Sequence, residues 1–267
     1  MMSLKKPKKS LGQNFLMDKN IINKIVKIGN VGINNTVLEI GPGYGSLTKK
    51  IAELKPKKLL AIEKDKKISL SLTKKFKNSK NIQIINEDIM NVIKNKKIGE
   101  NIIVFGNLPY NISTQILAAL LLLEKWPPWY SKLILMFQKE VADRITAKVN
   151  TKEYGRLSVL CNWRMKVTNH FNVSKNCFFP KPKISSSVLS FEPKKNKFNI
   201  KNPKNLEKIT RIFFSNRRKM INKNFNKIFS TNDLIVKDLN LNLKKRPGEI
   251  SNETYYNLTI KYEELFS

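Results

Sequence analysis

Segments typical of buried strands alternate with helical segments over most of this chain, and no other feature constrains its fold as strongly. The strand-like runs are residues 36–40, 58–62, 82–85, 102–104, 132–138 and 185–191. Short apolar runs that are separated by helical patterns are typical of a parallel sheet with helices on both faces. We therefore predict an α/β fold that is built on a doubly wound, Rossmann-like sheet.

The strand pattern ends near residue 191, and the remaining chain has only helical patterns. Residues 192–197 read as a linker because lysines and a proline replace the apolar residues. Beyond them, apolar residues recur at helical spacing, as in Leu206, Ile209, Ile212 and Phe213. We therefore predict two domains, residues 1–195 and a small all-helical domain of residues 196–267.

A glycine-rich turn, Gly41-Pro42-Gly43-Tyr44-Gly45, joins the first of these strands to a helix. Glycines let the backbone bend sharply and approach a ligand at the positive end of a helix. The spacing is G-x-G-x-G and not the G-x-G-x-x-G of dinucleotide binders, which argues against a dehydrogenase. Glu63 ends the next strand, about 20 residues further on, where an acid can hold a ribose. Asp88 follows the third strand and can accept a hydrogen bond from an adenine amino group, while Ile89 covers the ring.

A second turn, Asn107-Leu108-Pro109-Tyr110, follows the buried strand at residues 102–104. Open α/β sheets bind ligands at the carboxyl ends of their strands. The Asn107 side chain and the Pro109 carbonyl are two hydrogen-bond acceptors, and Tyr110 has a flat face. This set suits a planar base with an exocyclic amino group, such as adenine. The alternative is a loop in which Asn and Pro only shape the turn.

The charge balance predicts a polyanionic partner, because 51 Lys and Arg stand against 20 Asp and Glu, a net charge of +31. Nucleic acid is favoured over an anionic membrane surface, although an A/T-rich genome also enriches Lys, Asn and Ile. Residues before Lys9 form a basic arm without the apolar stretch of a signal peptide, and no run is long enough to span a membrane. We therefore expect a cytoplasmic protein without membrane contacts.

Three other basic sites are candidates for contacts with nucleic acid. Residues 178–183, Phe-Phe-Pro-Lys-Pro-Lys, place Lys181 and Lys183 next to two aromatic rings, which alternatively pack in the core. Arg217, Arg218 and Lys219 form a phosphate-binding candidate, with a solvated charge run as the alternative. Arg156 either contacts phosphate or forms a salt bridge at the start of a helix.

The sequence does not predict a metal site or a disulfide. Its one histidine, His170, and the absence of clustered cysteines argue against zinc. Cys161 and Cys177 are expected to be reduced thiols, because no secretory segment precedes them.

Taken together, these motifs resemble the rRNA adenine N6-dimethyltransferase family. The matching segments are Gln13-Asn14-Phe15-Leu16, residues 39–45, Glu63, Asp88, residues 107–110, and Lys181-Pro182-Lys183 before residues 185–188. Within that family, residues 155–159, 217–219 and 246–258 resemble the bacterial small-subunit branch. Its members dimethylate two adjacent adenosines near the 3′ end of small-subunit (16S) rRNA.

The resemblance implies a class I methyltransferase that uses S-adenosylmethionine as methyl donor. It implies cofactor contacts from Asn14, Leu16, Gly41, Gly43, Glu63, Asp88, Ile89 and Asn107. It also implies that Tyr110 and Phe178 sandwich the target adenine, whose amino group Asn107 and Pro109 hold. The implied partner is small-subunit rRNA in an assembling small ribosomal subunit, and a monomer is the simplest state. The alternatives are a large-subunit rRNA adenine dimethyltransferase, a DNA adenine methyltransferase and a non-catalytic ribosome assembly factor.

Overall fold

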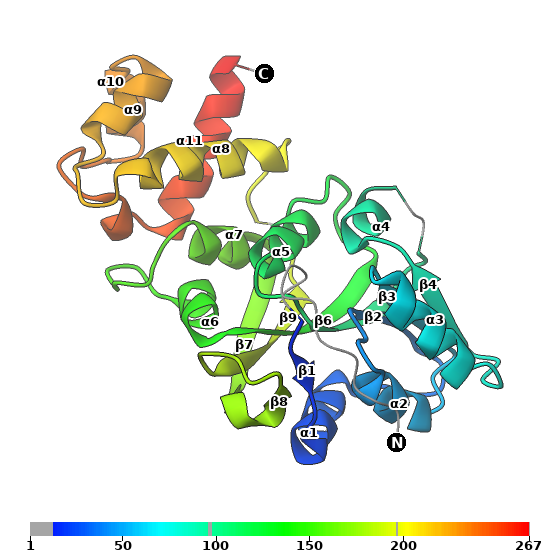
Figure 1. Ribbon diagram of the computed structural model, residues 1–267. Coiled ribbons are helices and arrows are strands. Elements are labelled where there is room, and N and C mark those ends of the chain that lie inside the picture. The colour runs from blue at the N-terminus through cyan, green and yellow to red at the C-terminus, as the bar shows by residue number, and fades with distance from the viewer. Residues whose placement is uncertain (1–12, 96–97, 196, 267) are drawn as a thin grey trace. The chain divides into compact units, whose positions relative to one another are not determined.

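The computed structural model describes residues 13–95, 98–195 and 197–266, so the predicted basic arm lies outside the described residues (Figure 1). The chain divides into two compact units. One unit contains the residues up to Leu120, Pro128–Ala142 and Thr168–Glu192, and the other contains Leu121–Pro127, Asp143–Val167 and Pro193 onward. The helical unit therefore takes in two segments that precede the predicted boundary at residue 195.

The first unit is organised around a seven-stranded sheet with the strand order β4-β3-β2-β5-β6-β9-β7. Its strands are β2 (Thr36–Ile40), β3 (Lys58–Glu63), β4 (Ile82–Asn86), β5 (Ile102–Asn107), β6 (Tyr130–Gln138), β7 (Met165–Val173) and β9 (Ser186–Pro193). The pairings among β2 to β6 are parallel, whereas β9 pairs antiparallel with β6. The order reverses between β2 and β5, which makes the sheet doubly wound. The predicted α/β fold is confirmed.

Parallel strands need crossover connections, and each crossover of this sheet contains a helix. These helices are α2 (Ser46–Glu53), α3 (Lys66–Lys75), α4 (Ile89–Asn95) and α5 (Ser113–Leu121). A further helix, α1 (Lys19–Gly29), precedes β2, and α6 (Lys139–Thr146) follows β6. Asp18 caps α1 as predicted, since its side chain accepts hydrogen bonds from the backbone N–H groups of Asn20 and Ile21. The buried face of α1 consists of Ile22, Ile25 and Val26.

A separate two-stranded ladder joins segments that lie far apart in the sequence. Strand β1 (Phe15–Leu16) pairs antiparallel with β8 (Phe178–Phe179), and the register places Leu16 opposite Phe178. The ladder continues with the Met17 N–H, which donates to the Cys177 carbonyl at 2.8 Å. Residues 15–17 are therefore held in place by residues 177–179, which precede β9.

The described residues of the second unit form helices and no sheet of their own (Figure 1). They are α7 (Arg156–Arg164), α8 (Pro203–Phe213), α9 (Asn222–Phe229), α10 (Asp233–Asp238) and α11 (Asn252–Phe266). Its core includes the fully buried Leu206, Phe213 and Tyr255. The α7 helix belongs to this unit because the Tyr256 hydroxyl of α11 donates to the Val159 carbonyl at 3.0 Å.

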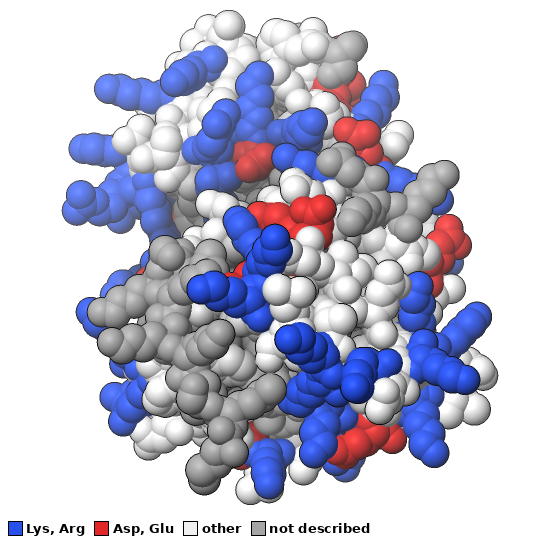
Figure 2. Space-filling model, turned by 45° about the vertical axis from the view of Figure 1, so that its right-hand side comes forward, with Lys and Arg blue, Asp and Glu red and all other residues white. Residues whose placement is uncertain are grey.

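Basic side chains are numerous on one face of the molecule, in keeping with the net charge of +31. Figure 2 shows Lys and Arg side chains distributed over the face that it draws, with few acidic side chains between them. No helix of the described chain is both long enough and apolar enough to cross a membrane.

Candidate active site

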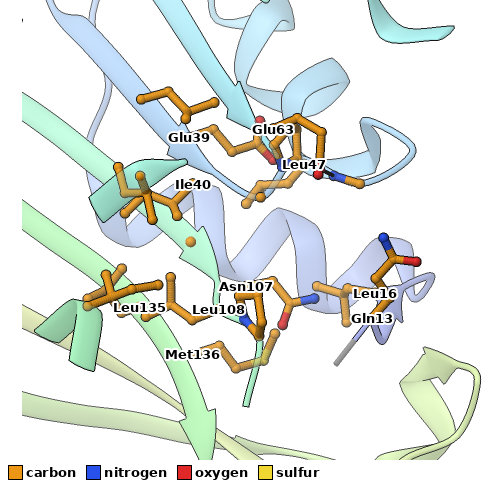
Figure 3. A pocket seen from close by; sticks show the side chains of 18 of the residues that line it. Gln13, Leu16, Glu39, Ile40, Leu47, Glu63, Asn107, Leu108, Leu135 and Met136 are labelled. Carbon is orange, nitrogen blue, oxygen red and sulfur yellow. Dashed lines mark hydrogen bonds between the residues drawn. The ribbon is translucent and has the colours of Figure 1, made fainter. Parts of the chain in front are cut away.

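One pocket lies where β2, β3 and β5 end, at the point where the strand order reverses (Figure 3). It is lined by every residue predicted to contact the cofactor: Asn14, Leu16, Gly41, Gly43, Glu63, Asp88, Ile89 and Asn107. Pro109 and Tyr110 also line it. The structure therefore brings together ten of the predicted site residues from five separate stretches of the sequence.

Position 43 of the glycine-rich turn strongly favours glycine. Gly43 has a φ of +55°, and a Cβ atom on it would lie 2.7 Å from the Phe15 ring. A side chain here would be strained and would push Phe15 out of place. Phe15 in turn packs against Tyr44, with ring centroids 4.3 Å apart. The turn and β1 therefore form one wall of the pocket together.

Glu63 ties this turn to the end of β3. Its Oε2 accepts a hydrogen bond from the Gly43 N–H at 3.3 Å, and its Oε1 accepts one from the Asp65 N–H at 2.8 Å. Burial raises the pKa of Glu63, although the two backbone N–H groups oppose this rise. A carboxylate in this position is suited to accept hydrogen bonds from the hydroxyls of a ribose.

Asp88 lies at the next strand end with both carboxylate oxygens in use. Oδ1 accepts from the Met90 N–H at 2.9 Å, and Oδ2 lies 2.8 Å from Lys64 Nζ. The hydrogen bond from Lys64 lowers the pKa of Asp88, so the carboxylate stays ionised. Carboxylate oxygens have about two acceptor sites each, so an adenine amino group can still bind here.

Glu39 is a pocket residue to which the sequence analysis assigns no role. It lies in β2, is only 1% exposed, and its Oε2 has no hydrogen-bond partner among the described residues. Burial raises the pKa of Glu39 from 4.5 to about 7, and the nearby Glu63 adds to this rise. The signal for it was present in the sequence, because an acid inside the apolar run Thr36–Ile40 breaks the pattern of a buried strand.

The side chain of Asn107 has a fixed orientation. Its Nδ2 donates to the Asn14 carbonyl at 2.8 Å, so its Oδ1 remains available as an acceptor. Figure 3 shows Asn107 across the pocket from Glu39 and Glu63. The Pro109 carbonyl accepts one hydrogen bond, from the Ile112 N–H at 3.1 Å, and keeps a second lone pair. Two acceptors therefore stand at the end of β5, as the sequence predicts.

Of the two predicted aromatic residues, only Tyr110 lines the pocket. Its hydroxyl is 2.7 Å from the Ser186 Oγ. Phe178 is 5% exposed and packs in the apolar core together with Leu16. The adjacent Phe179 is 45% exposed, because consecutive strand residues point to opposite faces. A stacking role for Phe178 stays a prediction, and it requires the Phe178 ring to leave this core.

The basic candidates lie outside the pocket lining. Lys181 and Lys183 are exposed in the segment between β8 and β9. The exposed Arg217, Arg218 and Lys219 follow a short 3₁₀ helix, η3 (Phe214–Asn216). Arg156 Nη2 lies 3.4 Å from Glu207 Oε1. This ion pair is the salt bridge that the sequence analysis gave as the alternative to a phosphate contact. The RNA contacts of all six residues stay predictions.

The cysteines and the histidine take no part in the pocket. Cys161 and Cys177 are free thiols. The His170 Nε2 lies 2.8 Å from the Ser190 Oγ, on a different part of the sheet. Among the described residues, no group of three or more His, Cys, Asp or Glu side chains is placed to hold a metal ion.

Two relatives that carry the same name are similar to this chain over nearly their whole length. "Ribosomal RNA small subunit methyltransferase A" of Pelagibacter ubique is 48% identical and covers 97% of this chain and 98% of its own. The protein of the same name from a Wolbachia of Drosophila simulans is 39% identical, with 98% and 96% covered.

Solved structures support the fold. A dimethyladenosine transferase from Plasmodium falciparum superposes with a TM-score of 0.77 at 24% identity, covering 94% of this chain and 98% of that chain. The 23S rRNA methyltransferase ErmE superposes with a TM-score of 0.68 at 20% identity, covering 93% and 99%. The sequence profile described as "Ribosomal RNA adenine dimethylase" matches residues 4–264. This chain therefore belongs to the ribosomal RNA adenine dimethylase family.

Proposed function

We propose that this protein transfers methyl groups from S-adenosylmethionine to N6 of two adjacent adenosines near the 3′ end of small-subunit rRNA, giving N6,N6-dimethyladenosine. The observation that carries the proposal is the fixed Asn107 amide, which lies across the pocket from Glu39 and Glu63. The relatives that are 48% and 39% identical over nearly the whole chain carry small-subunit names, which supports the small-subunit substrate.

The pocket fits the proposed methyl donor, which supplies a methyl group on a sulfonium cation. The buried Glu39 Oε2 lacks a partner among the described residues and suits the cationic amino group of the methionine part. Glu63 suits the ribose hydroxyls, and Asp88 suits the adenine amino group while Ile89 covers the ring. Gly41 and Gly43 let the backbone of the turn approach closely. These four contact types explain why acids and glycines gather on one side of the pocket.

The opposite side of the pocket suits the target amino group. The amino nitrogen of adenine is a weak nucleophile, because its lone pair is conjugated into the ring. Asn107 Oδ1 and the Pro109 carbonyl accept hydrogen bonds from the amino N–H groups, which draws the lone pair out of the ring plane. The nitrogen releases one proton to solvent for each methyl group that it gains. Catalysis then consists of positioning and electrostatic stabilisation, and it needs no histidine base.

The target base has to leave its stack to reach this pocket. Tyr110 offers a flat face that returns roughly 1–3 kcal/mol of stacking free energy per base. In this proposal Phe178 supplies the second face after its ring leaves the core. The basic residues Lys181, Lys183, Arg217, Arg218, Lys219 and Arg156 hold the RNA backbone, in keeping with the net charge of +31.

We further propose that the protein works as a monomer in the cytoplasm, on small subunits that are still assembling. In this proposal the helical unit contacts rRNA outside the target site, as do Lys181 and Lys183 of the sheet unit. A non-catalytic assembly role is the second candidate, and it is compatible with the same fold. A catalytically dead variant separates the two roles, because it would still support subunit maturation if binding alone were needed.

The deciding experiment compares four substrates: small-subunit particles, naked small-subunit rRNA, large-subunit rRNA and duplex DNA. Each is incubated with the protein and methyl-labelled S-adenosylmethionine, and dimethyladenosine is mapped by mass spectrometry of RNA fragments. We expect label in two adjacent adenosines near the 3′ end of the small-subunit rRNA. Label in large-subunit rRNA or DNA instead, or no label in any substrate, would overturn the proposal.

A further inference from the structure

The Tyr110 side chain is anchored by a residue from a distant strand. Its hydroxyl lies 2.7 Å from the Oγ of Ser186, the first residue of β9. Ser186 is fully buried, with 0% of its surface exposed, so water does not compete for this bond. Residues 110 and 186 are 76 positions apart, and β6 lies between β5 and β9 in the sheet.

The backbone of Tyr110 is held in place as well. The Tyr110 carbonyl accepts a hydrogen bond from the Ser113 hydroxyl at 3.2 Å, and Ser113 begins α5. A tyrosine ring has two rotatable bonds, so a fixed backbone and a fixed hydroxyl leave it little freedom. Burial raises the pKa of Tyr110, so the phenol keeps its proton near neutral pH and can take part in this bond as a donor.

We propose that Ser186 is a positioning residue that holds the Tyr110 ring at the angle at which the target base stacks on it. The inference rests on the proposed function, because it concerns how the target adenine is held. Ser186 acts through Tyr110 and touches neither the methyl donor nor the base. Without the bond the ring can rotate, and a smaller fraction of the bound RNA has its base in the reactive position.

The alternative is that this bond only satisfies a buried hydroxyl, and Ser187 offers a matched control for that. It is the next residue of β9, is also 0% exposed, and donates to Asn172 Oδ1 at 2.8 Å. Because side chains alternate along a strand, Ser187 points to the other face, and it does not line the pocket. Ser187→Ala therefore removes a buried hydroxyl and one hydrogen bond without touching Tyr110.

The test measures steady-state methylation of small-subunit particles by Ser186→Ala, Ser187→Ala, Tyr110→Phe and the double variant Ser186→Ala/Tyr110→Phe. We expect kcat to fall roughly three- to tenfold in Ser186→Ala, the kinetic equivalent of one ordinary hydrogen bond. The Kd for S-adenosylmethionine and the KM for the particles should stay near their wild-type values. Ser187→Ala should keep the wild-type kcat even if both serine variants unfold at the same lowered temperature.

The double variant distinguishes positioning from packing. If Ser186 acts through the Tyr110 hydroxyl, Tyr110→Phe causes the same loss, and the double variant is no slower than either single one. Equal kcat values in Ser186→Ala and Ser187→Ala, or losses that add in the double variant, would overturn the inference. If Ser186→Ala does not fold, the Tyr110→Phe variant provides the test. A wild-type kcat in Tyr110→Phe would overturn the inference. A wild type that methylates no rRNA adenine would instead refute the proposed function.

Discussion

Glu39 provides a test of the pocket that does not depend on any ligand. It is 1% exposed in β2, and burial raises its pKa from 4.5 to about 7. A carboxyl group with a raised pKa in the folded state binds more protons there than in the unfolded chain. The free energy of unfolding of the wild type is therefore highest below pH 4.5, and it falls as the pH rises to about 7. A rise of this size corresponds to roughly 3 kcal/mol of unfolding free energy.

The perturbation is Glu39→Gln, which keeps the shape of the side chain and is neutral at every pH. We expect the variant to gain stability relative to wild type by roughly 3 kcal/mol between pH 4.5 and pH 7.5, because ionisation of Glu39 then costs the wild type that much. Urea unfolding of both proteins, followed by circular dichroism at several pH values, measures this difference. Other titrating groups largely cancel, because they are common to both proteins.

The control is Glu253→Gln, which changes an exposed glutamate in α11. Its stability should follow that of the wild type at every pH. If the stability curves of Glu39→Gln and wild type run parallel across the same pH range, Glu39 ionises freely. The explanation of Glu39 as an acid whose ionisation is opposed by burial would then be wrong.

Four other outcomes follow from the geometry. Asn107→Ala should lower kcat by about 100-fold or more, since it removes an acceptor of the target amino group. Calorimetry should find nearly unchanged cofactor affinity, and near-normal methylation would refute the role of Asn107 in holding the amino group. Glu63→Ala should weaken cofactor binding by roughly 10- to 100-fold, and unchanged affinity in the same titration would reject the ribose contact. Gly43→Ala should lower the free energy of unfolding by about 1–3 kcal/mol in thermal melts, because its φ is +55° and its Cβ would meet Phe15; a wild-type Tm would contradict this. Changing Arg217, Arg218 and Lys219 together to Ala should reduce the slope of log affinity against log salt by roughly 2–3, and an unchanged slope in filter binding would exclude phosphate contacts.

The sequence by itself determined the sheet and the chemical character of its pocket. Residues 41–45, Glu63, Asp88 and residues 107–110 each follow a strand-like run, and parallel strands end at one edge of a sheet. Local periodicity therefore sufficed to predict that these side chains meet. Local periodicity did not predict strand β7, because exposed polar residues such as Asn169 and Asn172 interrupt its apolar positions.

Tertiary structure alone decided the contacts that fix this pocket. The pairing of β1 with β8 involves two residues on each side, which is too short for any periodic signal. That ladder buries Phe178 and leaves Phe179 exposed, although the two rings are chemically equal in the sequence. The bonds from Asn107 to Asn14 and from Tyr110 to Ser186 span 93 and 76 positions. Such bonds depend on how folded elements meet in space, so the sequence determined which groups are present and the fold decided how each is oriented.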